Sequence, residues 1–287
     1  MTSDFKEDLK LGPSNIKQVS DQYRKIRNTF RFLLGNVNPE DFDPKKDMVA
    51  YKDLEPADQY VLILLNDTVK AVRKDVLDYD YVAADKALIN FMTNTLSSYY
   101  CDFTKDILYC NARDDHRRRQ VQSVYWQCVD SLAKLWAPFL VYTMEEVWQH
   151  FNDDSEESVH YCHFPEVETY DNEAEIRDMF TKLMDVRTDV LKALEESRNA
   201  KTIGTAQEAE VDVTVSEEEK ELLEKGLKGE TAQWLIVSKA VVETGERHVK
   251  VVRAQGTKCP RCWNYTLNPD ENGLCPRCHS VMAKENA

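Results

Sequence analysis

Two copies of the tetrapeptide Cys-Pro-Arg-Cys lie near the end of the chain, and they constrain its fold more than any other feature. They place thiols at Cys259, Cys262, Cys275 and Cys278, with twelve residues between the pairs. A two-residue gap lets both thiolates of a pair reach one metal ion, so this spacing is typical of a four-cysteine zinc site. Two disulfides or a redox-active dithiol are the alternatives, but two matched pairs favour one structural Zn²⁺.

The segment around these cysteines, residues 256–287, is too short to bury a core that folds unaided. We therefore expect the metal to supply much of its folding free energy, as in a zinc ribbon. Four thiolates fill the tetrahedral coordination of zinc and leave no position for a substrate. The predicted site is structural rather than catalytic.

The rest of the chain favours helices. It is 287 residues long, with 31% charged residues and only eight Gly and nine Pro, which argues against a glycine-punctuated β fold. No apolar run approaches the roughly 18 residues that cross a bilayer. The remaining cysteines, Cys101, Cys110, Cys128 and Cys162, are scattered, so we interpret them as buried reduced thiols and expect a cytoplasmic protein. We also expect the chain to be monomeric.

Apolar residues at helical spacing predict a bundle of long antiparallel helices. The first helix ends near Gly35 and Asn36, a loop covers residues 38–53, and a second helix starts near Pro56. The predicted apolar stripes are Val19, Tyr23, Ile26, Phe30 and Leu33; Leu62, Leu65, Val69, Val72 and Val76; Ala84, Leu88, Phe91, Thr95 and Tyr99; and Val121, Tyr125, Cys128, Leu132 and Leu135. Pro138 interrupts the fourth helix, and a short helix then carries Glu145, Glu146 and Trp148.

A small α+β module is predicted next. Asp171 or Asn172 caps a long helix that runs past Arg198. Alternation from Ala209 to Val215 predicts a strand, residues 217–227 a helix, and residues 235–237 and 249–251 two more strands. The expected organisation is a mainly α chain with a helical bundle over residues 1–165, the long helix and α+β module over 166–255, and the zinc module over 256–287.

Charge is polarised along the chain. The net charge is −14, which by itself argues against a nucleic-acid partner. Residues 14–36, however, hold five basic residues against Asp21, a net +4, whereas residues 145–178 hold twelve acids against Arg177, a net −11. An acidic total therefore leaves room for a basic binding face. It also leaves room for a non-catalytic protein-interaction scaffold that uses the acidic stretch from Glu145 to Asp178.

Arg24, Arg27, Asn28 and Arg31 share one face of the first helix because they stand at i, i+3, i+4 and i+7. Such a row could follow an RNA backbone, with arginine forks on phosphates and Asn28 on a base edge. Spacing alone favours an ordinary solvated face.

Three residues of the cysteine segment are further candidates. Trp263 follows the first pair and either stacks on an unpaired base or packs as the core of the small module. Arg261 and Arg277 lie inside the two pairs, where they neutralise the thiolates or also contact phosphate. With a net charge of only +1 over residues 256–287, the segment alone is expected to bind RNA weakly.

Other patterns have plainer explanations. The basic run His116 to Arg119 follows Asp114 and Asp115, which is typical of a helix start. His160 and His163 flank Cys162 in a proline-bounded loop, and His279 is a second choice as a metal ligand. Phosphate-binding glycine loops, a dinucleotide fingerprint and a nucleophile elbow are all absent from the sequence.

Several segments together resemble the C-terminal part of bacterial isoleucyl-tRNA synthetases. The resemblance covers nearly the whole chain, and the tail from Cys259 to Tyr265 carries it most specifically. The matching stretches are residues 20–36, Asp58 to Leu62, Ala137 to Phe139 with Glu145 to Trp148, Leu194 to Ala209, and the two Cys-Pro-Arg-Cys pairs.

The resemblance implies a function in tRNA recognition. In these enzymes the bundle grips the anticodon stem-loop and a zinc module closes over it, so Arg24, Arg27, Asn28, Arg31 and Trp263 become expected contacts to isoleucine tRNA. The family's HIGH and KMSKS-type motifs and its editing domain have no counterpart here. We therefore expect a chain that binds tRNA beside the catalytic core of a longer enzyme and does not activate isoleucine itself.

Overall fold

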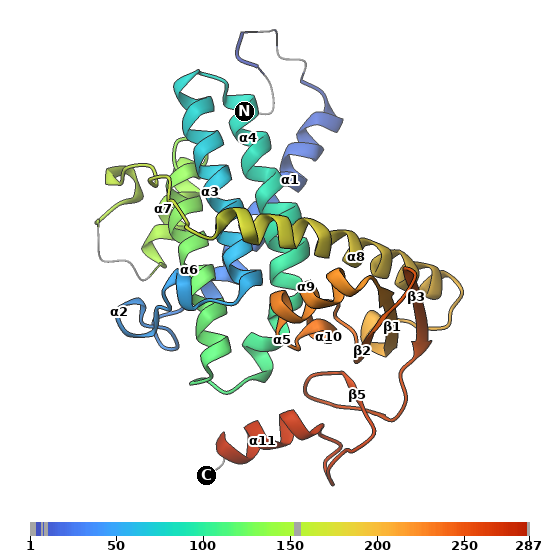
Figure 1. The fold of residues 1–287 in the computed structure, drawn as a ribbon. Coiled ribbons are helices and arrows are strands. Elements are labelled where there is room, and N and C mark those ends of the chain that lie inside the picture. Colours follow the sequence, from blue (N-terminus) through green and yellow to red (C-terminus); the bar gives the residue numbers. More distant parts are fainter. Residues whose placement is uncertain (1–3, 7, 9–10, 152–155, 286–287) are drawn as a thin grey trace. The chain divides into compact units, whose positions relative to one another are not determined.

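The computed structural model describes every residue except 1–3, 7, 9–10, 152–155 and 286–287 (Figure 1). The chain is mainly helical, as predicted, with a small three-stranded sheet and a two-stranded ribbon. It divides into two compact units. Unit 1 comprises residues 1–54, 61–101 and 119–170, and unit 2 comprises residues 55–60, 102–118 and 171–287.

Unit 1 is the helical bundle. Its helices are α1 (Pro13–Asn36), the short α2 (Pro44–Asp47), α3 (Pro56–Leu77) from Val61 onward, α4 (Tyr81–Asn90), a π-helical segment (Phe91–Tyr100), α6 (His116–Trp136) from Arg119 onward, and α7 (Val141–Gln149). Its core includes Phe30, Leu62, Leu88, Tyr125 and Trp136, each at most 1% exposed. The predicted stripes of the second and fourth helices are confirmed, apart from the partly exposed Val76.

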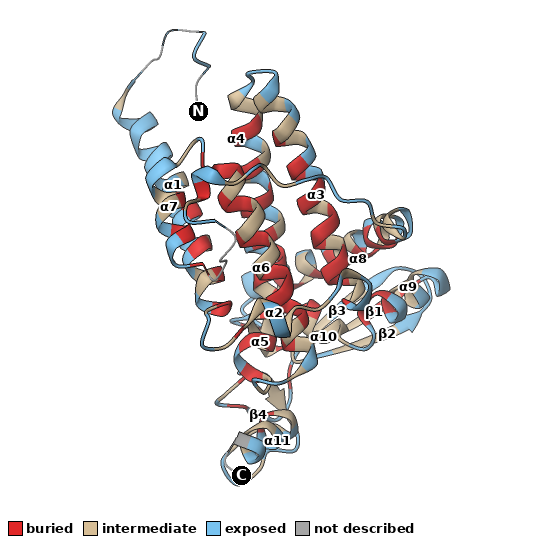
Figure 2. Cartoon of the chain, turned by 90° about the vertical axis from the view of Figure 1, so that its left-hand side faces the viewer, coloured by how far each residue is buried: buried red, intermediate tan, exposed pale blue. Residues whose placement is uncertain are grey.

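Two expectations for the bundle are wrong. In α1 only the second half is buried, at Ile26, Phe30, Leu33 and Asn36, whereas Val19 is 44% and Tyr23 37% exposed; Figure 2 shows the first turns of α1 as exposed. A helix residue is buried only where another element packs against it, and the spacing of apolar residues does not show where that happens. The loop over residues 38–53 also contains α2 and a 3-10 turn, Tyr51–Asp53.

The third predicted helix comprises α4 and the π-helical segment. The π-helical segment leads directly into α5 (Cys101–Cys110), and its buried residues include Phe91, Leu96 and Tyr100. A π-helix takes more residues per turn than an α-helix. Four of the five predicted stripe residues, Ala84, Leu88, Phe91 and Tyr99, are buried, whereas Thr95 is only partly buried and its neighbour Leu96 is buried instead.

Unit 2 contains the α+β module. Its elements are the first residues of α3, α5 from Asp102 onward, the start of α6, α8 (Glu173–Asn199), β1 (Ala209–Val215), α9 (Glu217–Leu227), α10 (Thr231–Trp234), β2 (Lys239–Thr244), β3 (His248–Arg253), β4 (Thr257–Lys258), β5 (Tyr265–Thr266) and α11 (Pro276–Glu285). Asn172 stands at the N-cap of α8, but its side-chain amide donates to Gln59 instead of capping the helix.

The sheet has the order β2-β1-β3, with β2 parallel and β3 antiparallel to β1. β1 buries alternate residues, Ala209, Val211, Val213 and Val215, as its sequence predicts, and α8 packs against β1 and β3. A capping box between Ser216 and Glu219 starts α9.

The strand predicted over residues 235–237 is wrong. These residues form a turn after α10 in which Leu235 and Val237 are buried and Ile236 has a positive φ of 61°. The real strand, β2, starts at Lys239. A short apolar run does not distinguish a buried turn from a strand.

Candidate metal centre and nucleic-acid interface

The four predicted cysteine ligands come together in unit 2. Their sulfur atoms all lie within 4.8 Å of one another. Cys259, Cys262 and Cys278 are buried and Cys275 is partly exposed. A set of four converging thiols is chemically suited to a metal ion with tetrahedral preference.

Local backbone bonds form the knuckle of the first cysteine pair. Trp263 N–H donates to the Cys259 carbonyl at 2.9 Å, and Cys259 N–H donates to the Asn264 carbonyl at 2.9 Å. Backbone N–H groups also point at sulfur: that of Cys275 lies 3.4 Å from Cys259 Sγ, and that of Cys278 lies 3.5 Å from Cys275 Sγ. Such N–H···S contacts favour the thiolate, which is the form that binds metal.

The thiols differ in acidity. Burial alone would raise the pKa of Cys259, but N–H groups of Cys262, Cys275 and Arg261 lower it to about 6. Burial raises the pKa of Cys278 to about 11, and burial also raises the pKa of Cys262. A cation bound among them would have to displace protons from the latter two.

Histidines do not join the cysteine cluster. His279 Nδ1 lies 2.7 Å from Asp270 Oδ2, and His160 Nε2 lies 3.2 Å from the Val141 carbonyl. Within the described part of the chain, the four cysteines are the one group of three or more His, Cys, Asp or Glu side chains with metal-binding proximity.

Arg261 and Arg277 are engaged with the end of α5. Arg277 makes a bidentate ion pair with Asp106, at 2.6 Å and 2.8 Å, and Arg261 Nη1 donates to the Cys110 carbonyl. Cys110 packs in the same buried cluster as Cys259, Cys262 and Cys278. The sequence analysis placed Cys110 only among the scattered cysteines and did not single out Asp106, because nothing local links residues 106–110 to a segment more than 150 positions later.

Trp263 is 57% exposed and has a positive φ of 67°. Lys258 Nζ lies 5.2 Å from the centroid of its ring, within cation–π range. Of the two roles left open by the sequence, exposure disfavours the core residue and leaves an aromatic face beside a cation at the surface.

The row on α1 lies in unit 1 and is exposed at all four positions, Arg24, Arg27, Asn28 and Arg31. Arg24 is 3.5 Å from Asp21, and Arg27 is 3.8 Å from Glu146. Both pairs are solvated, and exposed ion pairs of this kind contribute little. Their cationic groups therefore exchange partners at small cost.

A groove between α1 and the helix formed by α4 and the π-helical segment adds polar groups to this unit. It is lined by Lys17, Gln18, Lys25, Lys86, Asn90 and Asn94, among others. In the sequence, Lys17 and Lys25 count only among the five basic residues of the segment 14–36. A sequence signal for the groove is lacking, because it depends on α4 lying beside α1.

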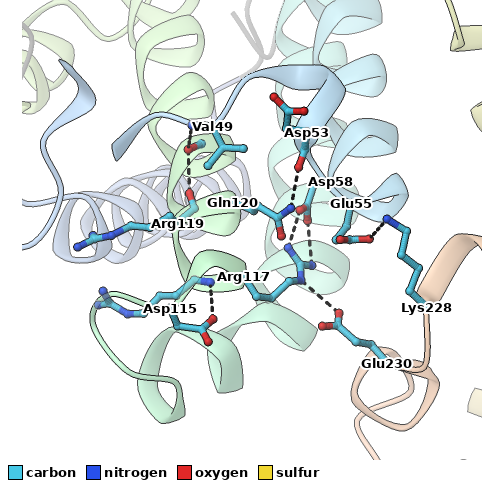
Figure 3. A network of polar contacts seen from close by, with 12 residues as sticks. Val49, Asp53, Glu55, Asp58, Asp115, Arg117, Arg119, Gln120, Lys228 and Glu230 are labelled. Atoms are coloured by element: carbon cyan, nitrogen blue, oxygen red, sulfur yellow. Dashed lines mark hydrogen bonds and ion pairs between the residues drawn. The ribbon is translucent and has the colours of Figure 1, made fainter. Parts of the chain in front are cut away.

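The basic run at the start of α6 includes Arg117, which belongs to unit 2 and joins a network of ion pairs there. Arg117 makes a bidentate ion pair with Asp58, at 2.5 Å and 3.1 Å, and its Nε lies 3.2 Å from Glu230 (Figure 3). Asp58 is fully buried. Burial raises the pKa of the Glu230 carboxyl, and the charge of Arg117 opposes that shift. These groups hold the start of α3 and α6 to the segment before α10.

Several carboxylates of the acidic stretch have partners within their own unit. In unit 1, Glu145 accepts from Ser158 and Gln149; in unit 2, Glu173 pairs with Arg177, and Glu175 pairs with Lys225. Asp153 and Asp154 lie outside the described residues. Within the described residues, no helix is both long and apolar enough to cross a membrane.

Residues 58–213 match the family described as the anticodon-binding domain of tRNA ligase. Isoleucine–tRNA ligases are similar over almost the whole chain: that of Bacillus licheniformis is 39% identical over 97% of this chain, that of Macrococcus caseolyticus 39% over 98%, and that of Streptococcus sanguinis 37% over 99%.

The alignments cover 32% of the length of each of these three ligases, so the chain spans about a third of the curated relatives that it matches. The family match, by contrast, covers more than half of the chain. The matched residues comprise most of α3, the helices α4 to α8 and part of β1. The chain belongs to the anticodon-binding domain family of tRNA ligases.

Proposed function

We propose that this chain binds the anticodon stem-loop of isoleucine tRNA, as the RNA-recognition region of an isoleucine–tRNA ligase. The observation that carries the proposal is the 37–39% identity to isoleucine–tRNA ligases over nearly all of the chain. The ligation of isoleucine to tRNA, a cytoplasmic location, a monomeric state and cooperation with a catalytic core are parts of the same proposal.

The proposed contacts use two kinds of chemistry. Arg24, Arg27 and Arg31 neutralise stem phosphates, whose binding dominates affinity for nucleic acids. Asn28 and Trp263 contact splayed loop bases, by an amide and by stacking respectively. Arg261 and Arg277 have a supporting role in the proposed surface, since their guanidinium groups already bond to α5.

The proposed ion of the cysteine cluster is one structural Zn²⁺, held by Cys259, Cys262, Cys275 and Cys278. Four sulfur ligands favour zinc among the common divalent ions. When bound, the ion holds the two knuckles together and supplies folding free energy. We also retain as a proposal the three domains expected from the sequence, residues 1–165, 166–255 and 256–287.

The test is a titration of the chain with a fluorescent isoleucine anticodon stem-loop at several salt concentrations. Arg27→Ala and Arg31→Ala should each weaken binding and lower the salt-dependence slope by about 1, the signature of a lost phosphate contact. Lys70→Ala is the matched control, because Lys70 is an exposed cation on α3 of the same unit.

A stem-loop with a scrambled loop separates base recognition from charge. We expect it to bind more weakly but with a similar salt slope. An absence of binding at low salt would refute the proposal for this chain. Unchanged affinity in both arginine variants would show that the row on α1 is an ordinary solvated helix face and not an RNA contact.

A further inference from the structure

The C-terminal end of α5 lies against the cysteine module within unit 2, and two arginines make the connection. Each arginine occupies the same place in its pair, directly before the second cysteine: Arg261 before Cys262, and Arg277 before Cys278. Arg277 forks onto Asp106, and Arg261 donates to the backbone carbonyl of Cys110. Both receptors lie within the last five residues of the helix.

The geometry of the pair with Asp106 is the strong form of an arginine–carboxylate contact. Two parallel N–H···O bonds of 2.6 Å and 2.8 Å fix the planar guanidinium in one orientation. The Asp106 side chain is 22% and that of Arg277 36% exposed. This pair is less solvated than the arginine contacts on α1, so water weakens it less.

Sulfur packing reinforces the same contact. Cys110 is 4% exposed and belongs to a buried cluster with Cys259, Cys262 and Cys278, against which Leu274 also packs. The last residue of α5 therefore contributes a fifth sulfur to the wall of the metal centre. The centre is enclosed on this side by the helix rather than by the small module itself.

We propose that Asp106 and the carbonyl of Cys110 form a docking site for the cysteine module, and that Arg261 and Arg277 are positioning residues that seat the module on α5. Because each arginine is bonded to the neighbouring metal-binding cysteine through one peptide link, fixing its guanidinium limits the movement of that ligand. Groups that orient metal ligands in this way contribute to metal retention. The inference rests on the proposed zinc ion of the cysteine cluster and not on RNA binding.

The test measures zinc release from the full chain. The zinc-loaded protein is mixed with excess chromogenic chelator, and the release rate is followed for Asp106→Asn. Loss of one charged partner of a bidentate pair should speed release about tenfold or more. Asp102→Asn is the matched control, since Asp102 lies on the same helix and pairs locally with Lys105; its release rate should equal that of the parent chain.

A double-mutant cycle isolates the contact. Arg277→Gln should speed release as much as Asp106→Asn, and the double variant should be no faster than either single one. Hydrogen exchange of residues 257–285 should rise in the same variants. Equal release from Asp106→Asn and Asp102→Asn, or additive effects in the cycle, would overturn the docking site.

A third variant covers the case in which Asp106→Asn does not fold. Arg277→Lys keeps the positive charge but loses the fork, so faster zinc release from it supports the docking role. Parent-like release from Arg277→Lys would show that charge alone suffices and would overturn the role of the fork.

Discussion

At the residue scale, the surroundings of each arginine decide its role. Arg118 is 8% exposed, and its Nε donates to the Leu108 carbonyl at 3.1 Å. Arg24 and Arg31, which look similar in the sequence, are solvent-exposed on α1. In the sequence, Arg118 belongs to the basic run His116 to Arg119, and Arg24 and Arg31 belong to the basic segment 14–36. The buried arginines are held by partners distant in sequence or by backbone carbonyls, and neither is visible in a charge count.

Trp263→Ala is expected to weaken stem-loop binding while zinc content stays at one ion per chain. An exposed ring adds stacking area for a base but little core packing, and a stacked base is worth about 1–3 kcal/mol. Fluorescence anisotropy and metal analysis of the same preparation check the two effects. Loss of zinc would identify Trp263 as a core residue instead.

Asp58→Asn is expected to lower the free energy of unfolding by about 3 kcal/mol, because it leaves the charge of the nearly buried Arg117 without its main counter-charge. Urea denaturation measures the change. Glu173→Gln is the matched control: its pair with Arg177 is of similar length, 2.7 Å, but about one-third exposed, so its loss should cost at most about 1 kcal/mol. Equal costs would mean that burial is not what makes the Asp58 pair important.

At the element scale, the sequence-based prediction of secondary structure fails where a short apolar pattern is compatible with both a strand and a turn. Residues 235–237 have the composition of a strand, yet they turn, and β2 forms from the more polar stretch that starts at Lys239. β2 forms its hydrogen bonds by parallel pairing with β1. This pairing exists only in the folded chain, so the local sequence of β2 does not predict it. The long helices were predictable because several turns of apolar spacing have no such ambiguity.

Gly256 directly precedes β4, at the start of the cysteine module. Its φ is +95°, and a β-carbon there would lie 2.2 Å from the Thr266 carbonyl oxygen. Gly256→Ala should therefore displace β4 from β5 and weaken zinc binding at least about tenfold, measured by competition with a chelator.

Gly229→Ala is the control, since Gly229 has a similar φ of +92° but nothing within 4 Å of the added carbon. It should show the strain of a positive φ without the clash. Equal zinc affinities of the two variants would contradict the close approach at Gly256.

At the scale of the whole molecule, charge is separated rather than balanced. The net charge of −14 hides a basic α1 face and an acidic stretch in which some carboxylates, such as those of Glu145 and Glu173, have local partners. Sequence alone located both regions. It did not distinguish acids that form internal pairs from acids that make a binding surface, because pairing depends on the folded chain.

Removal of the metal is expected to act locally. A strong chelator should unfold residues 257–285 but leave most of the far-UV helical signal, because the core of unit 1 contains none of the four ligands. Circular dichroism and hydrogen exchange, before and after chelation, check this. A cooperative loss of the helical signal would show that the bundle depends on the metal.

The sequence by itself determined the four-cysteine cluster, the long helices, the strand from Ala209 to Val215 and the resemblance that the family match supports. The first three depend on residue spacing within a short stretch, and the resemblance depends on matching residues along the chain. Only the tertiary structure decided that half of α1 is uncovered, that Arg117 is buried against Asp58, and that Arg261 and Arg277 bond to α5. These depend on residues tens to more than a hundred positions apart, and a linear pattern contains no information on which distant groups meet.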